Sequence, residues 1–270
     1  MVNRRCPPPA TMVVSSAYGE AMAQLSGRQL AELVDPSLNA LGVKYMLDPG
    51  TGAIGKGAGY PRGFPFYMAG RGGVLGDVDP DVIYAAFMFF DKELVTSAWN
   101  QGIAVEGPGP ASRRYAGAAD AWAVANMKPS ADLLRFTELA RKIVDGVDSA
   151  GLTLFAGLRA LGLPSGEVER AYRLATYLRE LRGCVHMHAV RAQGLTALQA
   201  MLASSHGERM AGLHGYQPPY PDCSHLVAKR ERAEALTDEL MGDIYDAVLT
   251  GGERAEFHEL VRGESSPLGQ

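Results

Sequence analysis

Histidine and cysteine side chains, which are common metal ligands in proteins, are concentrated in one part of this sequence. Seven of the nine lie within residues 184–225, and the densest group is Cys184, His186 and His188. Thiolate and imidazole groups suit zinc, iron or haem, so a transition metal or haem held by these three residues is one expectation. Neighbours at i,i+2 on a helix point roughly 200° apart, however, so only Cys184 and His188 share a side. Ordinary hydrogen-bonded imidazoles are therefore the simpler interpretation.

A second set of residues suggests a small-molecule site. His186, Tyr67 and Glu180 are the candidate catalytic residues, because an imidazole titrates near neutral pH and can act as a general acid or base. The candidate ligand-binding residues are two cations and three aromatic side chains: Arg71, Arg182, Phe87, Phe90 and Trp99. Such a set suits an aromatic or carboxylate-bearing molecule. The alternative is that Arg71 and Glu180 form a structural ion pair.

A glycine-rich stretch over residues 50–76 is the most unusual segment, since ten of its 27 residues are glycine. Its first part, Gly50–Lys56, has the spacing G-x-x-x-x-G-K of a phosphate-binding loop. Such a loop needs Ser or Thr next for Mg²⁺, and this chain has Gly57, so we do not expect a nucleotide hydrolase. Because aromatic residues accompany the glycines, we expect an ordered, pocket-forming loop.

The overall composition indicates a globular protein. The 270 residues carry a net charge of −4, so no global basic field attracts nucleic acid or anionic lipid. Three cysteines are too few for a disulfide scaffold and fit a reducing compartment. The longest apolar run, Val82–Phe90, is shorter than a membrane span, and the first residues do not resemble a signal peptide. We therefore expect a cytoplasmic protein with no membrane partner.

The elements that would position these residues are helices. Apolar side chains recur at helical spacing over residues 15–36, 79–100, 112–127, 130–147 and 165–182, and no convincing alternating strand appears. Ser130 is a good N-cap for the fourth of these helices, and Pro80 suits the first turn of the second. The sequence thus predicts a mainly α fold.

The segment after residue 183 has the order of a helix-turn-helix. A short helix at 185–193, a turn at Gly194, and a helix at 197–205 capped by Thr196 are followed by a proline-rich stretch, 207–225, which suits a wing. A last helix is expected at 229–249. The presumed recognition helix reads GLTALQAMLASS and has no charged residue with which to contact bases or phosphates. From this we expect that DNA is not a partner.

Two stretches resemble a known family. They are Tyr67-Met-Ala-Gly-Arg-Gly-Gly-Val-Leu-Gly76 and Leu178-Arg-Glu-Leu-Arg-Gly-Cys-Val-His186. They are similar to segments of an actinobacterial helix-turn-helix family with the architecture of MarR-type winged-helix proteins. Leu41, Leu181 and Cys184 depart from its pattern. The resemblance implies a tandem winged-helix fold, arranged as an internal pseudo-dimer or as a homodimer, rather than a particular activity.

On this basis the chain divides into a disordered arm, a degenerate winged-helix-like unit that includes the 50–76 loop, a C-terminal winged-helix-like unit, and a tail. The boundaries are 1–14, 15–127, 128–262 and 263–270. We expect a small-molecule pocket protein on a repurposed MarR-like scaffold, which binds or transforms an aromatic or carboxylate-bearing metabolite in specialised metabolism. The alternatives are a metal- or haem-dependent enzyme using ligands within 184–225, and a ligand-responsive transcriptional regulator.

Overall fold

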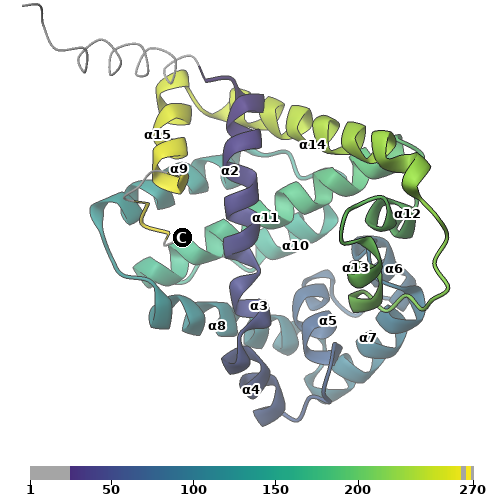
Figure 1. Ribbon diagram of the computed structural model, residues 1–270. Helices are drawn as coiled ribbons and strands as arrows, with labels where there is room; N and C mark the ends of the chain where they lie inside the picture. The colour runs from purple at the N-terminus through teal and green to yellow at the C-terminus, as the bar shows by residue number, and fades with distance from the viewer. Residues whose placement is uncertain (1–24, 263–265, 269–270) are drawn as a thin grey trace, which may run out of the picture.

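The computed structural model describes residues 25–262 and 266–268, which form a mainly α-helical fold without a β-strand (Figure 1). The helices are α2 (Gly27–Gly42), α3 (Lys44–Leu47), α4 (Pro49–Gly57), α5 (Pro65–Gly72), η1 (Gly73–Leu75), α6 (Pro80–Ala86), α7 (Lys92–Glu106), α8 (Pro108–Asn126), α9 (Ala131–Gly146), α10 (Thr153–Ala160), α11 (Glu167–Ala192), α12 (Ala197–Leu202), α13 (Gly207–Leu213), η2 (Ser224–Leu226), α14 (Val227–Val248) and α15 (Gly251–Arg262). The prediction of a mainly α fold is confirmed. The expected arm at 1–14 and most of the expected tail lie outside the described residues.

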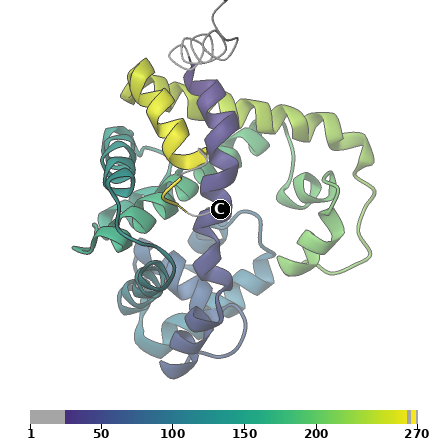
Figure 2. The same cartoon turned by 60° about the vertical axis from the view of Figure 1, so that its left-hand side comes forward.

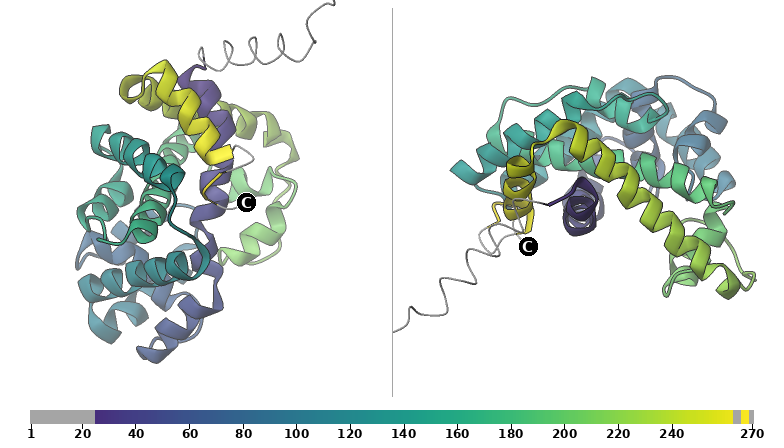
Figure 3. Two further views of the ribbon diagram at one scale, coloured as in Figure 1. Left: turned by 90° about the vertical axis from the view of Figure 1, so that its left-hand side faces the viewer. Right: turned by 90° about the horizontal axis from the view of Figure 1, so that it is seen from above.

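The long helix α11 runs through the middle of the fold. Helices α2, α8, α9, α10 and α14 all pack against it, and α2 crosses its front face (Figures 1 and 3). Tyr172, Leu174 and Leu181 of α11 are fully buried, so this helix is apolar on more than one side. A helix of this kind must be covered all round, which explains its central place. Along the described chain, no helix is long and apolar enough to cross a membrane.

Helix starts follow the capping signals of the sequence. Ser130 accepts a hydrogen bond from the Leu133 amide at the start of α9, and Thr196 with Gln199 forms a capping box at α12. The helix expected at 15–36 differs from α2, which begins after the N-cap Ser26 and continues through Pro36 to Gly42. Residues 15–24 of the expected helix lie outside the described residues. Pro36 is exposed, so its ring points away from the core.

Two predicted helix boundaries were wrong. The helix expected at 79–100 is broken at Phe87–Phe90, and α7 starts afresh because the Asp91 carboxylate caps the Glu93 and Leu94 amides. Conversely, the chain does not turn at Gly183. The two helices expected at 165–182 and 185–193 are one helix, α11, of 26 residues. Packing of α11 on five neighbouring helices outweighs the weak helix propensity of one glycine.

The glycine-rich segment is also not the loop that we expected. Residues 49–57 and 65–72 form α4 and α5, each starting with a proline in its first turn. The stretch Gly50–Lys56, which has the spacing of a phosphate-binding loop, therefore lies within a helix. At Gly70, a Cβ would lie 2.3 Å from the Tyr115 Cβ, so glycine there lets α5 lie directly against α8. Gly55 and Gly73 also allow close packing, whereas a Cβ at Gly52 or Gly57 would meet nothing within 4 Å.

Helices α12 and α13 stand to one side of the main body, below one end of α14 (Figures 1 and 2). They are built on a second, smaller hydrophobic core, whose members include Val190, Leu195, Ala200 and Leu226. The expected wing at 207–225 begins with a helix, α13, and its remainder is irregular chain without a strand in the described residues. A proline-rich composition had concealed this short helix.

Candidate functional site

A cavity of about 410 Å³ lies between the main body and helices α12 and α13. Its lining residues come from α2, α5, α11, α12, α13, α14 and the 86–90 segment: Asn39, Tyr67, Arg71, Ala86, Phe87, Phe89, Phe90, Arg179, Glu180, Arg182, Gly183, His186, Met187, Ala200, Met201, Ser204, Met210, His214 and Arg230. The cavity therefore brings together all the predicted catalytic and ligand-binding residues except Trp99. Trp99 is fully buried behind α5 and donates its indole N–H to the Val78 carbonyl at 3.2 Å.

Arg71 and Glu180 form a bidentate ion pair at the floor of this cavity. The Arg71 Nε and Nη2 atoms lie 2.9 and 2.6 Å from the two Glu180 oxygens, and Nη1 donates to the Tyr67 hydroxyl at 2.7 Å. The guanidinium also lies over the Phe87 ring, 4.5 Å from its centroid. Burial alone would raise the pKa of Glu180, but Arg71 outweighs burial and holds that pKa below its usual range. Both groups are thus charged and engaged with each other.

His186 projects from α11 toward α14. Its Nδ1 atom lies 2.9 Å from the Thr237 hydroxyl, and its ring stacks on Phe89 with 5.7 Å between centroids. Burial lowers the pKa of His186, although the nearby Glu234 carboxylate opposes this effect. The imidazole is consequently neutral at pH 7, the form in which it can accept a proton.

A charged cluster closes the α14 side of the cavity. Arg182 and Arg230 each place an Nη2 atom 3.0 Å from an oxygen of Glu234. Arg182 also lies 3.6 Å from the buried Asp35 carboxylate and 3.9 Å from Asp238. Arg182 is therefore surrounded by acids, and α2, α11 and α14 are tied together through it.

Sequence reasoning did not select Arg179 or Arg230, although both line the cavity. Arg179 lies three residues before Arg182 and seven before His186, so helical spacing alone puts the three on one face of α11. Arg230 had no such signal, because only the packing of α14 against α11 brings it to the site.

The predicted metal ligands do not come together. Cys184 is buried against α10, where burial raises the pKa of its thiol to about 11, and His188 contacts the Gly151 carbonyl at 3.1 Å. His186 faces α14 instead. In the part of the chain that the structure describes, no group of three or more His, Cys, Asp or Glu residues is arranged to hold a metal ion. The metal or haem alternative gains no support from this geometry.

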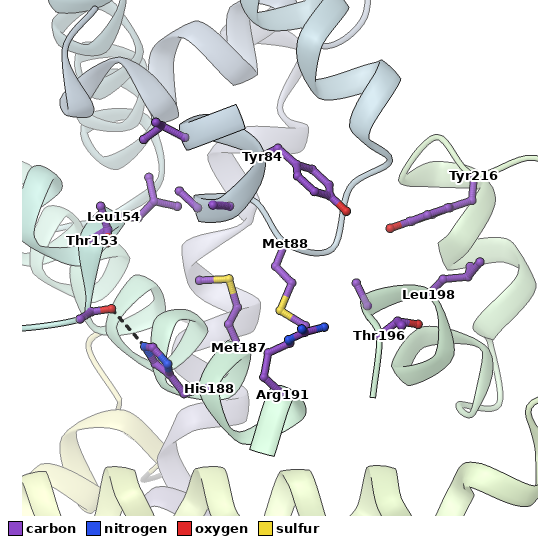
Figure 4. A pocket seen from close by; sticks show the side chains of 15 residues that line it. Tyr84, Met88, Thr153, Leu154, Met187, His188, Arg191, Thr196, Leu198 and Tyr216 are labelled. Carbon is purple, nitrogen blue, oxygen red and sulfur yellow. Dashed lines mark hydrogen bonds between the residues drawn. The ribbon is translucent and has the colours of Figure 1, made fainter. Parts of the chain in front are cut away.

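A second cavity, of about 770 Å³, lies on the other side of Met187 and Ala86, which line both cavities. Tyr84 and Met88 form one wall, and Leu198 and Tyr216 lie across from them (Figure 4). Like the first cavity, it is bounded by the main body on one side and by the α12 region on the other. Two hollows thus flank the junction between these parts.

Comparison with known proteins identifies a family. Residues 28–218 match a family model described as a helix-turn-helix family. Neither the curated proteins nor the solved structures contain a match. The helix-turn-helix is a DNA-binding motif, so this match overturns the expectation that DNA is not a partner. That expectation relied on the uncharged stretch 194–205, whereas the helix that follows it in the structure, α13, carries charged residues.

Proposed function

We propose that this chain, which belongs to the helix-turn-helix family, is a ligand-responsive transcriptional regulator that contacts DNA through α12 and α13. The observation that carries the proposal is the family match over residues 28–218. The order of α11, α12, α13, an irregular segment and α14 supports the MarR-like architecture implied by the sequence. The division into units at residue 127 stays a proposal, with DNA binding assigned to the 128–262 unit.

The tight turn between α12 and α13 supports this assignment. A Cβ at Gly207 would lie 2.6 Å from both the Met201 carbonyl oxygen and the Leu202 Cα, so glycine is required where α13 starts against α12. Such close packing of two short helices fixes their angle. That angle decides how the second helix enters the major groove.

The exposed side of α13 offers groups that can read bases. Glu208 and Arg209 are exposed near its start, and Met210 and Leu213 are 38% and 55% exposed. Arginine recognises guanine in the major groove, carboxylates accept from cytosine, and apolar groups contact the thymine methyl. We therefore assign α13 as the recognition helix.

Phosphate contacts would come from the turn and from the start of α14. His206, Lys229 and Arg232 are exposed there, and His206 shares a surface depression with Arg230. Lys229 and Arg232 supply positive charge next to the exposed Glu231, on a chain whose net charge is −4. Because phosphate contacts release counterions, binding through them must weaken as salt increases.

The ligand would act through the 410 Å³ cavity. Its walls include Met201 of α12 and Met210 of α13 on one side, and Arg71 and Glu180 of the main body on the other. A bound molecule would contact both parts at once and thereby favour one arrangement of the DNA-contacting helices. An aromatic or carboxylate-bearing molecule remains the class that we assign to this site.

The test of DNA binding starts from a random duplex pool, from which the purified protein selects sequences at 100 mM salt. Fluorescence anisotropy with a selected duplex then compares wild type with Arg209→Ala and Lys229→Ala. Arg209→Ala should weaken binding about 10-fold or more and relax sequence preference, and Lys229→Ala should weaken all sequences alike. Arg113→Ala, an exposed cation on α8, is the matched control. An unenriched pool, or equal affinity of Arg209→Ala and the control, would refute the proposal.

The same cavity supports a second candidate function, the transformation of a bound metabolite. It rests on the neutral imidazole of His186, held by Thr237 beside the Arg71–Glu180 pair. In this case His186→Ala would abolish turnover of a cavity ligand while leaving its affinity nearly unchanged.

A further inference from the structure

We propose that the cavity takes an organic carboxylate with an aromatic body, and that Arg179, not Arg71, binds its carboxylate group. This inference deepens the proposed function and rests on it only in treating the cavity as the ligand site.

Three of the five N–H donors of Arg71 are already used within the protein. Its Nε, Nη1 and Nη2 atoms are already engaged by Glu180 and Tyr67, at 2.6–2.9 Å. Its guanidinium face is covered by the Phe87 ring. A ligand carboxylate that paired with the Nε and Nη2 atoms of Arg71 would have to displace Glu180 and leave that carboxylate buried without its partner, which is strongly unfavourable.

Arg179 is in the opposite situation. Its closest acid is Glu180, at 3.5 Å from Nη1, and that carboxylate is already paired with Arg71. Its Nε atom is buried and has no hydrogen-bond partner among the described residues. Two guanidinium groups thus face one carboxylate, and one positive charge remains uncompensated at the cavity wall.

The other two arginines of the lining differ in this respect. Arg182 and Arg230 share Glu234, and Arg182 also faces Asp35 and Asp238. Of the four arginines that line the cavity in the described chain, Arg179 is therefore the one without an acid of its own. An anion is the natural complement of such a group, and a planar carboxylate matches the guanidinium fork.

The position of Arg179 is fixed before any ligand arrives. Its stem lies on Gly42 of α2, where a Cβ would come within 2.7 Å of the Arg179 Cδ. The side chain is only 17% exposed. A restrained cation loses little freedom on binding, so its contact with an anion contributes more to affinity than that of a mobile surface arginine.

The rest of the cavity suits an aromatic body. Phe87, Phe89, Phe90 and Met201 line it, and Glu180 is its one acidic lining residue in the described chain. A volume of about 410 Å³ is ample for a two-ring molecule and lies within the usual range of ligand pockets.

The test uses 2-naphthoate and its neutral analogue 2-naphthamide, with binding to the full chain measured by titration calorimetry without DNA. Wild type should bind the carboxylate about 10-fold or more tightly than the amide. Arg179→Gln should remove this preference, and Arg179→Lys should keep part of it. Arg113→Gln, an exposed arginine on α8, is the matched control and should keep it all. Circular dichroism verifies the fold of each variant.

Equal binding of the two probes by wild type would overturn the inference, as would binding of neither. A folded Arg179→Gln or Arg179→Lys variant with the full preference would also overturn it. DNA binding is measured separately on the same preparations. Protein that binds DNA without discriminating between the probes would refute this inference alone. Protein that discriminates between the probes but binds no DNA would refute the regulator alone.

Discussion

Replacement of Asp35 by asparagine should stabilise the protein above neutral pH. Asp35 is 2% exposed, its Oδ1 accepts a hydrogen bond of 2.6 Å from the Tyr245 hydroxyl, and its Oδ2 has no hydrogen-bond partner among the described residues. Burial raises the pKa of this carboxyl to about 7, although Tyr245 and Arg182 act against the increase and Asp238 adds to it. The folded state therefore holds a proton that the unfolded chain releases near pH 4.

The size of the effect follows from this difference. Below pH 4 the carboxyl is protonated in both states, and between pH 4 and 7 it is protonated only in the folded state. Stability must therefore fall across this window and level off above it. A pKa difference of roughly three units corresponds to about 4 kcal/mol, which is an upper value because local relaxation hydrates the charge.

Urea unfolding at pH 4.5, 6 and 8 measures this directly. Asp35→Asn should change stability little at pH 4.5 and increase it by about 2–4 kcal/mol at pH 8, since asparagine keeps the polar contact but cannot ionise. Asp77→Asn makes the same chemical change at an exposed position and serves as the control. If wild type and Asp35→Asn lose stability in parallel between pH 4.5 and 8, burial of Asp35 does not set its pKa and the reasoning fails.

Three further predictions concern the ion pair, the turn and a cap. Glu180→Gln should reduce the free energy of unfolding by about 3 kcal/mol, because it leaves the buried guanidinium of Arg71 unpaired. Glu32→Gln, which breaks an exposed ion pair, is the control and should cost less than about 1 kcal/mol. Urea unfolding measures both. Gly207→Ala should abolish selection of duplex DNA, because the added Cβ would displace α13 from α12. Gly212→Ala, where a Cβ meets only ordinary contacts, should still select DNA. Equal loss of DNA binding in both variants would contradict the close-packing argument. Ser130→Ala should lower stability by about 1 kcal/mol by removing the N-cap of α9, and a loss below 0.3 kcal/mol would show that the cap is unimportant.

Local signals in the sequence predicted much of the fold. Ser130 and Thr196 were identified as caps because short hydroxyl side chains before an apolar helical pattern have few other roles. Asp91 is an equally good cap and was missed, since it follows the unbroken apolar run that ends at Phe90. Gly183 shows the opposite error: one glycine was read as a break, although burial of the flanking residues keeps α11 continuous.

The sequence predicted which residues line the candidate site, but not how their charged groups pair with one another. Tyr67, Arg71 and Glu180 were selected from two stretches about 110 residues apart in sequence, and they line one cavity. Arg71 forms a bidentate pair with Glu180, whereas Arg179 reaches only the same carboxylate at 3.5 Å. This difference depends on side-chain orientations, which no spacing rule contains. The helix-turn-helix that we propose, α12 and α13, lies one helix later than the one expected from the sequence, because the irregular composition of 207–225 conceals α13.

The second hydrophobic core has a consequence for how the molecule opens. Val190 of α11 and Ala233 of α14 belong to the second core, and both of these helices also contribute residues to the main core. Ala200 of α12 and Cys223 lie in segments that contribute no residue to the main core. The α12–α13 region can therefore lose its packing while α11 and α14 stay folded on the main body. We predict that its amides exchange through a local opening of lower free energy than global unfolding, which breaks this small core and the hydrogen bonds to the 90–91 segment.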